Sequence, residues 1–198
     1  MVISALTLEG SAIRLIPLTR EHLDPLSAIG LSQDLWRFTT IRVTSRQEME
    51  AYIATALDGQ TAGTTLPFVI VEKGAETVIG TTRFHSLVPE HRRVEIGFTW
   101  IVPLRQRTGV NTEAKYLMLR HAFEAWGCIR VEFKADSTNE PSKRAMIGIG
   151  ATFEGTLRRC RTSEHRIHDL AVFSIIADEW PKVRLDLEQK IRDRSSRR

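Results

Sequence analysis

One segment constrains this chain more than any other: an apolar strand pattern that passes through a basic turn straight into a long helix pattern. Residues 96–102 are largely apolar, residues 105–109 supply two arginines and a glycine, and residues 111–126 repeat apolar side chains at helical spacing. The first backbone amides of a helix have no partner within the helix, so the amides of residues 107–111 can converge on an anion. The segment predicts a phosphate-binding turn, although a basic turn with a glycine before a helix is often only a turn.

The turn lacks the two best-known glycine signatures of nucleotide sites. It contains no GxxxxGK[ST] run. The other glycine cluster, at Gly148, Gly150 and Gly155, misses the third glycine of GxGxxG and follows no predicted strand. ATP and dinucleotides are therefore poor candidates for the ligand.

The rest of the chain alternates between strand and helix patterns and predicts an α+β fold. Strand patterns occur at residues 13–18, 66–72, 78–84, 94–102, 129–134, 153–159 and 168–176. Helices are expected at 45–59, where Ser45 and Glu48 form a capping box, at 111–126, with Glu113 on its polar stripe, and at 141–149. Thr19 predicts the cap of a short helix that Pro25 interrupts. This order favours a largely antiparallel sheet with helices on both faces.

Composition places these elements in one domain. The chain has 198 residues, of which 42% are hydrophobic and 26% charged, enough to form a core without disulfides or a structural metal. We expect a single domain over residues 1–181, followed by a basic C-terminal helix or tail over 182–198. Cys128 and Cys160 read as free thiols and no signal-peptide pattern begins the chain, which favours the cytoplasm. No apolar run approaches the ~20 residues of a membrane helix, so no membrane contact is expected.

The net charge of +4 comes from the C-terminal segment. Residues 182–198 hold seven basic and three acidic side chains, and the remaining charges balance at 21 against 21. These side chains are Lys182, Arg184, Lys190, Arg192, Arg194, Arg197 and Arg198, against Asp186, Glu188 and Asp193. A basic excess at a terminus is more typical of a solvated end than of a binding arm, so nucleic acid is not expected as a partner. Binding through this segment, the alternative, would weaken steeply with salt.

Four motifs, in order along the chain, resemble one known family. They are residues 94–100 (VEIGFTW), Gln106-x-x-Gly109-x-Asn111, Asn139-x-x-Ser142-x-x-Ala145, and residues 149–155 (IGATFEG). Over almost its whole length the chain resembles the GCN5-related N-acetyltransferases (GNAT), in the branch of the RimJ and RimL ribosomal-protein acetyltransferases. It departs from the family pattern at Asn111, where glycine or alanine is usual.

The resemblance implies acetyl-CoA as the cofactor, bound where two neighbouring parallel strands, expected at 94–102 and 129–135, splay apart in a V. The pantetheine arm would pair with the first strand, and the pyrophosphate would lie on the amides of the basic turn. The residues expected to contact the cofactor are Phe98, Thr99, Trp100, Ile101, Val102, Arg105, Gln106, Arg107, Thr108, Gly109, Val110, Asn111, Thr112, Asn139, Ser142 and Lys143. Among them, the basic side chains Arg105, Arg107 and Lys143 would face the phosphates.

Acyl transfer to an amine needs a neutral nucleophile, a stabilised oxyanion and a proton for the departing thiolate. Glu95 is the candidate general base, acting through one water, and the backbone amides near residues 99–101 are candidates for the oxyanion. Ser142 is the candidate proton donor to the thiolate. The open alternatives are an exposed Glu95 paired with Arg92 or Arg93, and a Ser142 that serves only its own helix.

The acceptor side is less distinctive. Trp36, Arg37 and Phe38 follow the first helices, and Arg83 and His85 lie in the predicted meander; together they are candidates to frame an amine-bearing acceptor. For Trp36 and Phe38, core packing is the better interpretation. A protein N-terminal α-amine, a polyamine, an amino acid and an aminocyclitol antibiotic all remain open as acceptors. We expect direct attack in a ternary complex, because neither cysteine is placed for a covalent intermediate.

Three further expectations concern a metal site, an alternative function and the assembly of the protein. No zinc site is expected at Cys160, His165, His168 and Asp169, because no second ligand pair follows at suitable spacing. A non-catalytic CoA-binding or sensing module is the alternative function. The apolar strand at 170–176 favours a homodimer.

Overall fold

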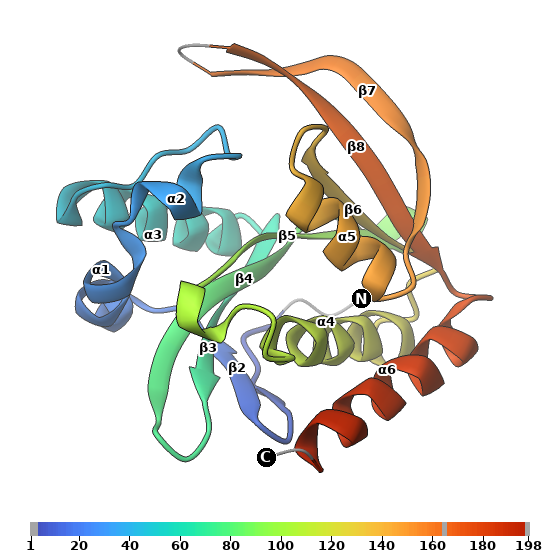
Figure 1. The fold of residues 1–198 in the computed structure, drawn as a ribbon. Helices are drawn as coiled ribbons and strands as arrows, with labels where there is room; N and C mark the ends of the chain where they lie inside the picture. The colour runs from blue at the N-terminus through green and yellow to red at the C-terminus, as the bar shows by residue number, and fades with distance from the viewer. Residues whose placement is uncertain (1–3, 164–165, 197–198) are drawn as a thin grey trace.

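The structure, a computed structural model, describes residues 4–163 and 166–196, which form an eight-stranded sheet (Figure 1). The spatial order is β1-β2-β3-β4-β5-β6-β8-β7, and neighbouring strands are antiparallel except β5 and β6, which run parallel. The strands are β1 (Leu8–Glu9), β2 (Ile13–Pro17), β3 (Thr65–Glu72), β4 (Thr77–Val88), β5 (Arg93–Ile101), β6 (Arg130–Asp136), β7 (Thr152–Ser163) and β8 (Arg166–Ile176). The predicted α+β class and largely antiparallel sheet are confirmed.

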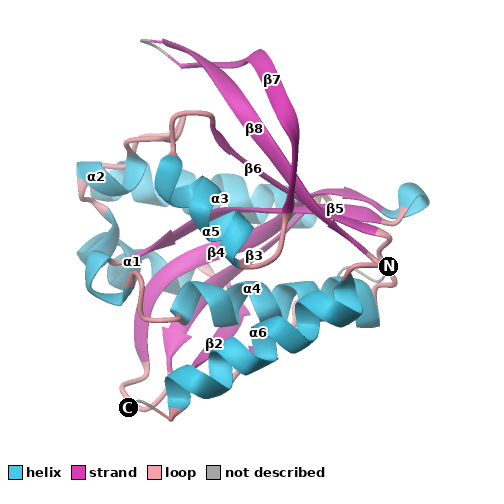
Figure 2. Ribbon diagram, turned by 45° about the vertical axis from the view of Figure 1, so that its right-hand side comes forward, coloured by secondary structure: helices cyan, strands magenta, loops and turns pink. Residues whose placement is uncertain are grey.

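Helices cover both faces of the sheet (Figure 2). One face carries α1 (Leu23–Gly30), α2 (Gln33–Trp36) and α3 (Arg46–Thr61); the other carries α4 (Val110–Arg120), α5 (Glu140–Gly148) and α6 (Trp180–Ser195). Along β3, Phe68 and Ile70 pack on the α4 side, whereas Val69 and Val71 pack on the α1–α3 side. This alternation, which follows from the two-residue period of a strand, gives the two faces of the sheet different helical layers.

Capping signals predicted the start of a helix better than its end. Ser45 Oγ accepts a hydrogen bond from Glu48 N at 3.2 Å, and the Glu48 carboxylate accepts one from Ser45 N at 3.0 Å, so the predicted capping box is confirmed. The helix nevertheless continues two residues past Gly59.

The prediction that Pro25 interrupts the first helix is wrong. Pro25 is the third residue of α1, where a missing amide costs no helical hydrogen bond.

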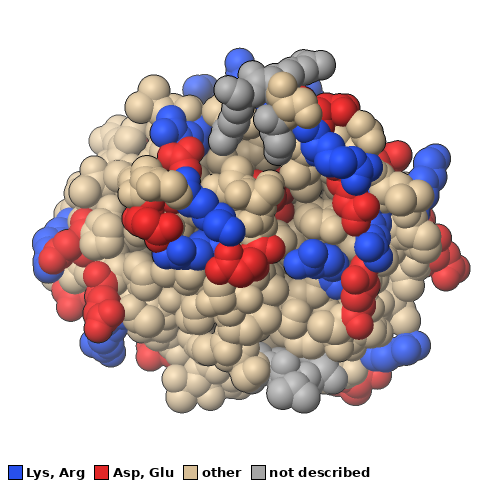
Figure 3. Space-filling model, turned by 90° about the horizontal axis from the view of Figure 1, so that it is seen from below, with Lys and Arg blue, Asp and Glu red and all other residues tan. Residues whose placement is uncertain are grey.

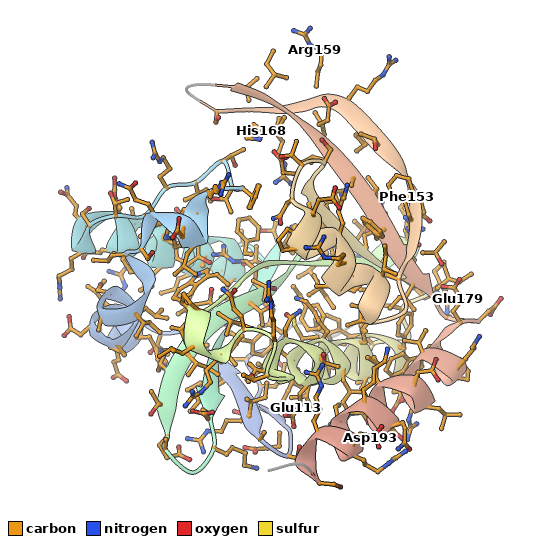
Figure 4. The ribbon with its side chains drawn as sticks, viewed as in Figure 1. Glu113, Phe153, Arg159, His168, Glu179 and Asp193 are labelled. Carbon is orange, nitrogen blue, oxygen red and sulfur yellow. The ribbon has the colours of Figure 1, made fainter. Side chains whose placement is uncertain are left out.

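The start of α4 is tied to the first strands by a buried carboxylate. Glu113, labelled in Figure 4, accepts hydrogen bonds from Ser11 Oγ at 2.8 Å and Ala12 N at 3.0 Å, and a further one from Ser11 N. The prediction that Glu113 lies on an exposed polar stripe is wrong. The turn between β1 and β2 covers the Glu113 carboxylate and supplies its hydrogen-bond donors. At the other end, α4 passes into a π-helical turn, His121–Ala125.

The C-terminal helix α6 packs on α4 through its apolar side. It begins at Trp180 and continues through the expected boundary between residues 181 and 182, and Val183 and Leu187 are buried in the core. Its charged side is partly neutralised, since Arg184 donates to Glu188 at 2.8 Å. Arg197 and Arg198 lie outside the described residues. On the face seen in Figure 3, basic and acidic side chains are interspersed.

The parallel strands β5 and β6 part after a short paired stretch. Within the described residues they pair at Arg93 with Arg130, Val94 with Val131 and Glu95 with Glu132. Beyond that point β5 stays paired with β4, and β6 with β8. The predicted V-shaped splay is therefore present, and it opens beyond Glu95 and Glu132. No helix in the described part of the chain is long and apolar enough to cross a bilayer.

Candidate active site

A β-bulge shapes the arm of the V that belongs to β5. Arg83 of β4 pairs with Gly97 and Thr81 pairs with Trp100, so three residue steps on β5 face two steps on β4. Phe98 takes up the extra length with a φ of 50° and is 37% exposed. Because a bulge locally disrupts the ladder, and because β6 has moved away from the opposite edge, backbone groups of β5 are open to an extended ligand.

The predicted phosphate-binding turn lies directly after this open edge. Gly109 is the N-cap of α4 with a φ of 104°, a conformation that glycine adopts without strain. Gln106 Nε2 donates to Ile101 O at 2.9 Å and Thr108 Oγ1 donates to Arg105 O at 2.7 Å, so side chains of the turn hold its shape. The amides of residues 110–112 form the first turn of α4, where no intrahelical acceptor exists. This arrangement can bind a pyrophosphate.

The basic side chains expected at the phosphates have different surroundings. Arg105 donates from Nε to Glu72 Oε1 at 2.8 Å, and Lys143 donates to Ser137 O at 3.0 Å. Arg107 is exposed, and within residues 4–163 and 166–196 it has no ion-pair partner. A side chain that sequence reasoning missed comes from α6. A Cβ at Gly109 would lie 2.8 Å from Arg194 Cδ, so this arginine packs against the turn.

Glu95 lies at the point where the strands part and is buried, on the sheet face covered by α1–α3. Lys134 Nζ donates to its Oε2 at 2.7 Å, and His85 Nε2 lies 3.4 Å from its Oε1. The alternative of an exposed Glu95 paired with Arg92 or Arg93 is contradicted, since β6 supplies the cation and covers the carboxylate. Glu95 is therefore a buried carboxylate with one ammonium group and one imidazole as neighbours.

The pKa values of two neighbours of Glu95 are shifted from their ordinary values. Burial lowers the pKa of His85 to about 4, so the ring is neutral near pH 7. Burial also opposes the charge of Lys134, but the hydrogen bonds that Lys134 donates to Glu95 and Glu132 outweigh burial and raise the pKa of Lys134. The His85 ring approaches β5 closely because Gly97 has no side chain; a Cβ there would lie 2.5 Å from His85 Nε2.

Arg83 covers the bulge on the same face. Its guanidinium carbon lies 4.1 Å from the Phe98 ring centroid and 4.8 Å from that of Tyr52. The structure thus brings together Arg83, His85 and Glu95, three of the residues that the sequence singled out.

A lysine that sequence reasoning did not single out lies on the α4 face. Lys115 is buried and donates from Nζ to Thr99 Oγ1 at 2.6 Å, just after the bulge. Burial lowers its pKa to about 7. The helix pattern gave no sign of this position, because a lysine at helical spacing normally reaches solvent.

Asn139 and Ser142 lie at the start of α5. Asn139 is the N-cap, and its Oδ1 accepts a hydrogen bond from Ser142 N at 3.1 Å. Ser142 is half-buried. The capping interaction fixes the serine backbone after β6, on the other arm of the V.

A pocket of about 290 Å³ lies between α2 and the β7–β8 hairpin, on the α1–α3 side of the sheet. Its lining includes Trp36, Arg37, Arg42, Ser163 and His168. Trp36 is also a core residue, as the sequence favoured, and donates from Nε1 to Gly30 O at 2.7 Å. Phe38 does not line the pocket and is only half-buried, so core packing is wrong for it; the Arg37 guanidinium lies 5.3 Å from its ring centroid.

His168 forms an interaction that the sequence did not predict. Its Nδ1 lies 2.6 Å from Asp136 Oδ2, and its Nε2 lies 2.9 Å from Ser163 Oγ. Of the other side chains considered for zinc, Cys160 is exposed and His165 lies outside the described residues. The Asp136 and His168 side chains come from adjacent strands but lie far apart in the sequence, which hides the pair from sequence reasoning.

Comparison with known proteins identifies the family. Residues 12–152 match the Acetyltransferase (GNAT) domain family, which is well over half of the 198 residues. The chain therefore belongs to the GNAT acetyltransferases, and the predicted resemblance is confirmed.

Individual relatives agree with this assignment. The Bacillus subtilis (strain 168) protein named "Uncharacterized N-acetyltransferase YoaA" is 33% identical over 107 residues, 54% of this chain and 60% of that protein. The chain thus spans about three fifths of the length of the curated relatives it matches. A GCN5-related N-acetyltransferase from Brucella melitensis is 27% identical with a TM-score of 0.86, covering 94% of this chain and 85% of that one.

A solved complex shares the fold at lower identity. Mycobacterium smegmatis RimJ in complex with CoA-disulfide is 23% identical, with a TM-score of 0.77 over 90% of this chain and 88% of that one.

Proposed function

We propose that this protein is an acetyl-CoA-dependent N-acetyltransferase that transfers the acetyl group to a primary amine. The observation that carries the proposal is the parting of β5 and β6 beyond Glu95 and Glu132. β5 then leads through its open edge into the turn at Gly109 and the start of α4, so a groove for an extended chain and a site for an anion are consecutive. Acetyl-CoA has this shape: a pantetheine arm with a pyrophosphate at one end and a thioester at the other. Membership of the GNAT family and the CoA complex of M. smegmatis RimJ support it.

In this proposal the pantetheine arm pairs with the backbone of residues 98–102, and the pyrophosphate accepts hydrogen bonds from the amides of residues 107–112. The exposed Arg107 is the basic side chain proposed to meet the phosphate charge, because Arg105 and Lys143 already have ion-pair partners. Asn139 and Ser142 then lie beside the cofactor on the β6 arm. The bulge at Phe98 supports a thioester position at residues 98–101, where backbone amides can stabilise the oxyanion.

The proposed chemistry is direct attack of the amine on the thioester in a ternary complex. Glu95 receives, through one water, the proton that the nitrogen loses as the new C–N bond forms. The C–S bond breaks, and Ser142 supplies a proton to the CoA thiolate. Glu95 is buried on the face of the sheet opposite α4. This position supports Glu95 as the base, since acetyl-CoA and the amine then approach from different sides of the sheet.

The proposed acceptor site is the pocket between α2 and β8, which Trp36 and Arg37 line. In this proposal Phe38 lies beside the pocket, outside its lining, and Arg83 and His85 extend the site toward the thioester. A lysine amine costs about 4–5 kcal/mol to deprotonate at pH 7, whereas an α-amine costs only about 1 kcal/mol. A site with one buried carboxylate as base therefore favours an α-amine, such as a protein N-terminus, over a lysine-like amine.

Other features of the proposal rest on the sequence. We place the protein in the cytoplasm, as a single domain over residues 1–181 followed by the basic segment 182–198, without nucleic acid or membrane as partner. A homodimer through β8 is the favoured assembly. The alternative function, a non-catalytic CoA-binding or sensing module, would retain the turn at Gly109 and have no need of Glu95 or Ser142.

The test is release of free CoA thiol from acetyl-CoA in the presence of primary amines. The panel is a peptide with a free N-terminus, a polyamine, an amino acid and an aminocyclitol, and mass spectrometry identifies the acetylated product. Amine-dependent thiol release supports the transferase. Acetyl-CoA binding without release for any amine supports the sensing module, and absence of binding contradicts both.

A further inference from the structure

The proposed acceptor pocket contains a chain of three hydrogen-bonded side chains. Ser163 Oγ lies 2.9 Å from His168 Nε2, and His168 Nδ1 lies 2.6 Å from Asp136 Oδ2. Ser163 and His168 line the pocket of about 290 Å³, and Figure 4 shows His168 on β8 at the side that faces α2. The chain therefore runs from the pocket wall to a carboxylate at the end of β6.

The buried Asp136 carboxylate determines which nitrogen of the neutral His168 ring carries the proton. The Asp136 side chain is 2% exposed and the His168 side chain 5%. Asp136 also accepts hydrogen bonds from Thr138 N at 2.9 Å and from Thr138 Oγ1. An ionised carboxylate only accepts, so His168 Nδ1 carries the proton and donates to it. While the ring is neutral, His168 Nε2 carries no proton and can accept one from the Ser163 hydroxyl. This order of groups is the one that withdraws a proton from a serine hydroxyl in hydrolytic triads.

The pocket connects the two arms of the V. Trp36 lines it, and the Trp36 and Trp100 ring centroids lie 5.9 Å apart, which links its wall to β5 beyond the bulge. Asp136, which holds His168, is the last residue of β6. The start of α4 lies on the opposite face of the sheet, because α4 packs in the other half of the core. A cofactor held at α4 and an acceptor in the pocket would meet between the strands.

We propose that Ser163, His168 and Asp136 form a proton relay that deprotonates the ammonium form of the acceptor before acyl transfer; the relay rests on the proposed function. An amine with a pKa near 8 arrives at pH 7 mostly as R–NH₃⁺. One ammonium proton passes to Ser163 Oγ while the hydroxyl proton passes to His168 Nε2. The electron pair of the broken N–H bond stays on nitrogen, which becomes the neutral nucleophile.

The relay and Glu95 handle different protons. The relay removes the first, leaving an imidazolium that faces the Asp136 carboxylate and later returns its proton to water. Glu95 receives the second as the C–N bond forms, while the C–S bond breaks and the thiolate is protonated. The sum is one acetylated amine, one CoA thiol and one proton released. Ser163 touches the substrate and is catalytic, and Asp136 is a positioning residue.

Charges around the pocket favour loss of a proton from a bound ammonium. Two arginines, Arg37 and Arg42, and one carboxylate, Asp34, line the pocket, so its lining carries a net positive charge, and among the described residues neither arginine has an ion-pair partner. A neutral amine is repelled less than an ammonium by nearby guanidinium groups. Among the side chains that the structure describes, the titratable or charged groups that face His168 are Asp136 of β6, Arg161 of β7, and Asp34, Arg37 and Arg42 of α2 and the loop after it.

The test compares kcat/KM for a peptide α-amine across pH in the wild-type protein and in His168→Gln. Without the relay, only the neutral fraction of the amine reacts, and that fraction falls tenfold for each pH unit below the amine pKa. His168→Gln should therefore lose about tenfold in activity one pH unit below that pKa and match the wild type above about pH 9. Ser163→Ala should follow the same slope, which guards against a folding defect of His168→Gln. Asp169→Asn, whose carboxylate accepts from Arg159 N at 2.7 Å on the same hairpin, is the matched control and should keep the wild-type profile.

Each other outcome overturns the relay. Equal profiles for the wild type, His168→Gln and Ser163→Ala show that none of these groups moves the proton. A loss of equal size at every pH indicates a structural role. An acetyl ester on Ser163, detected by intact-mass measurement after incubation with acetyl-CoA alone, makes the serine a nucleophile instead. If the wild-type protein acetylates no amine in the panel, the proposed function itself fails; if it does and the variants follow it, only the relay fails.

Discussion

Lys134 donates a hydrogen bond from Nζ to Glu95 Oε2 at 2.7 Å, just beyond the last paired position of β5 and β6. His85 Nε2 lies 3.4 Å from the other carboxylate oxygen, Glu95 Oε1. A cation and a neutral imidazole thus hold one buried carboxylate at the point of the V, where the proposed thioester and acceptor meet.

Glu95→Gln should reduce turnover by about 10²- to 10⁴-fold, the usual contribution of a general base, because the amide keeps the shape but cannot accept the proton. Acetyl-CoA affinity, measured by calorimetry, should stay near the wild-type value. Unlike the loss in His168→Gln, this loss should persist at high pH. Glu132→Gln is the matched control, since Glu132 also lies 3.2 Å from Lys134 Nζ on the same face. Wild-type turnover in Glu95→Gln would exclude it as the base.

His85 should make the protein less stable in mild acid. Burial lowers its pKa from 6.5 to about 4, so between these values the unfolded chain binds a proton that the folded protein does not. The free energy of unfolding should therefore fall as pH decreases through this window, by up to about 3 kcal/mol at its lower end. Urea unfolding of the wild type and of His85→Gln at several pH values measures this difference. Parallel pH dependences for the two proteins would contradict it.

Lys115 should cost stability near neutral pH. Burial lowers its pKa from 10.5 to about 7, so between these values the unfolded chain again binds the extra proton and stability rises with pH. Lys115→Met should raise the free energy of unfolding at about pH 7 by on the order of 3–4 kcal/mol, and the gain should shrink toward about pH 10. Lys182→Met, at an exposed position of α6, is the control. A gain that does not change with pH would point to packing rather than to the amine.

Features fixed by neighbouring residues could be predicted from the sequence. The capping box at Ser45 and Glu48 and the turn at Gly109 each depend on a few consecutive residues, and both lie where the patterns indicated. Periodicity predicted the order of the longer strands and helices, although not the short β1 and α2, and the family resemblance supplied the splay between β5 and β6.

Features that need a partner from elsewhere could not be predicted. The bulge at Phe98 exists only in register with β4, and Arg105 turns to Glu72, which is 33 residues away in the chain. The Asp136–His168 pair joins residues 32 positions apart. No local pattern marks these contacts, because tertiary packing creates them.

The amide of Asn111 is the second of α4 and one of those proposed to hold the pyrophosphate. Asn111→Pro removes this amide at a position where a helix tolerates proline, whereas Asn111→Ala removes only the side chain. Calorimetric titration with acetyl-CoA should find Asn111→Ala close to the wild type and Asn111→Pro weaker by about tenfold or more, since a hydrogen bond to a charged group contributes about 1.5–3 kcal/mol. Equal affinities for the two variants, or no binding by the wild-type protein, would contradict a cofactor held at the start of α4.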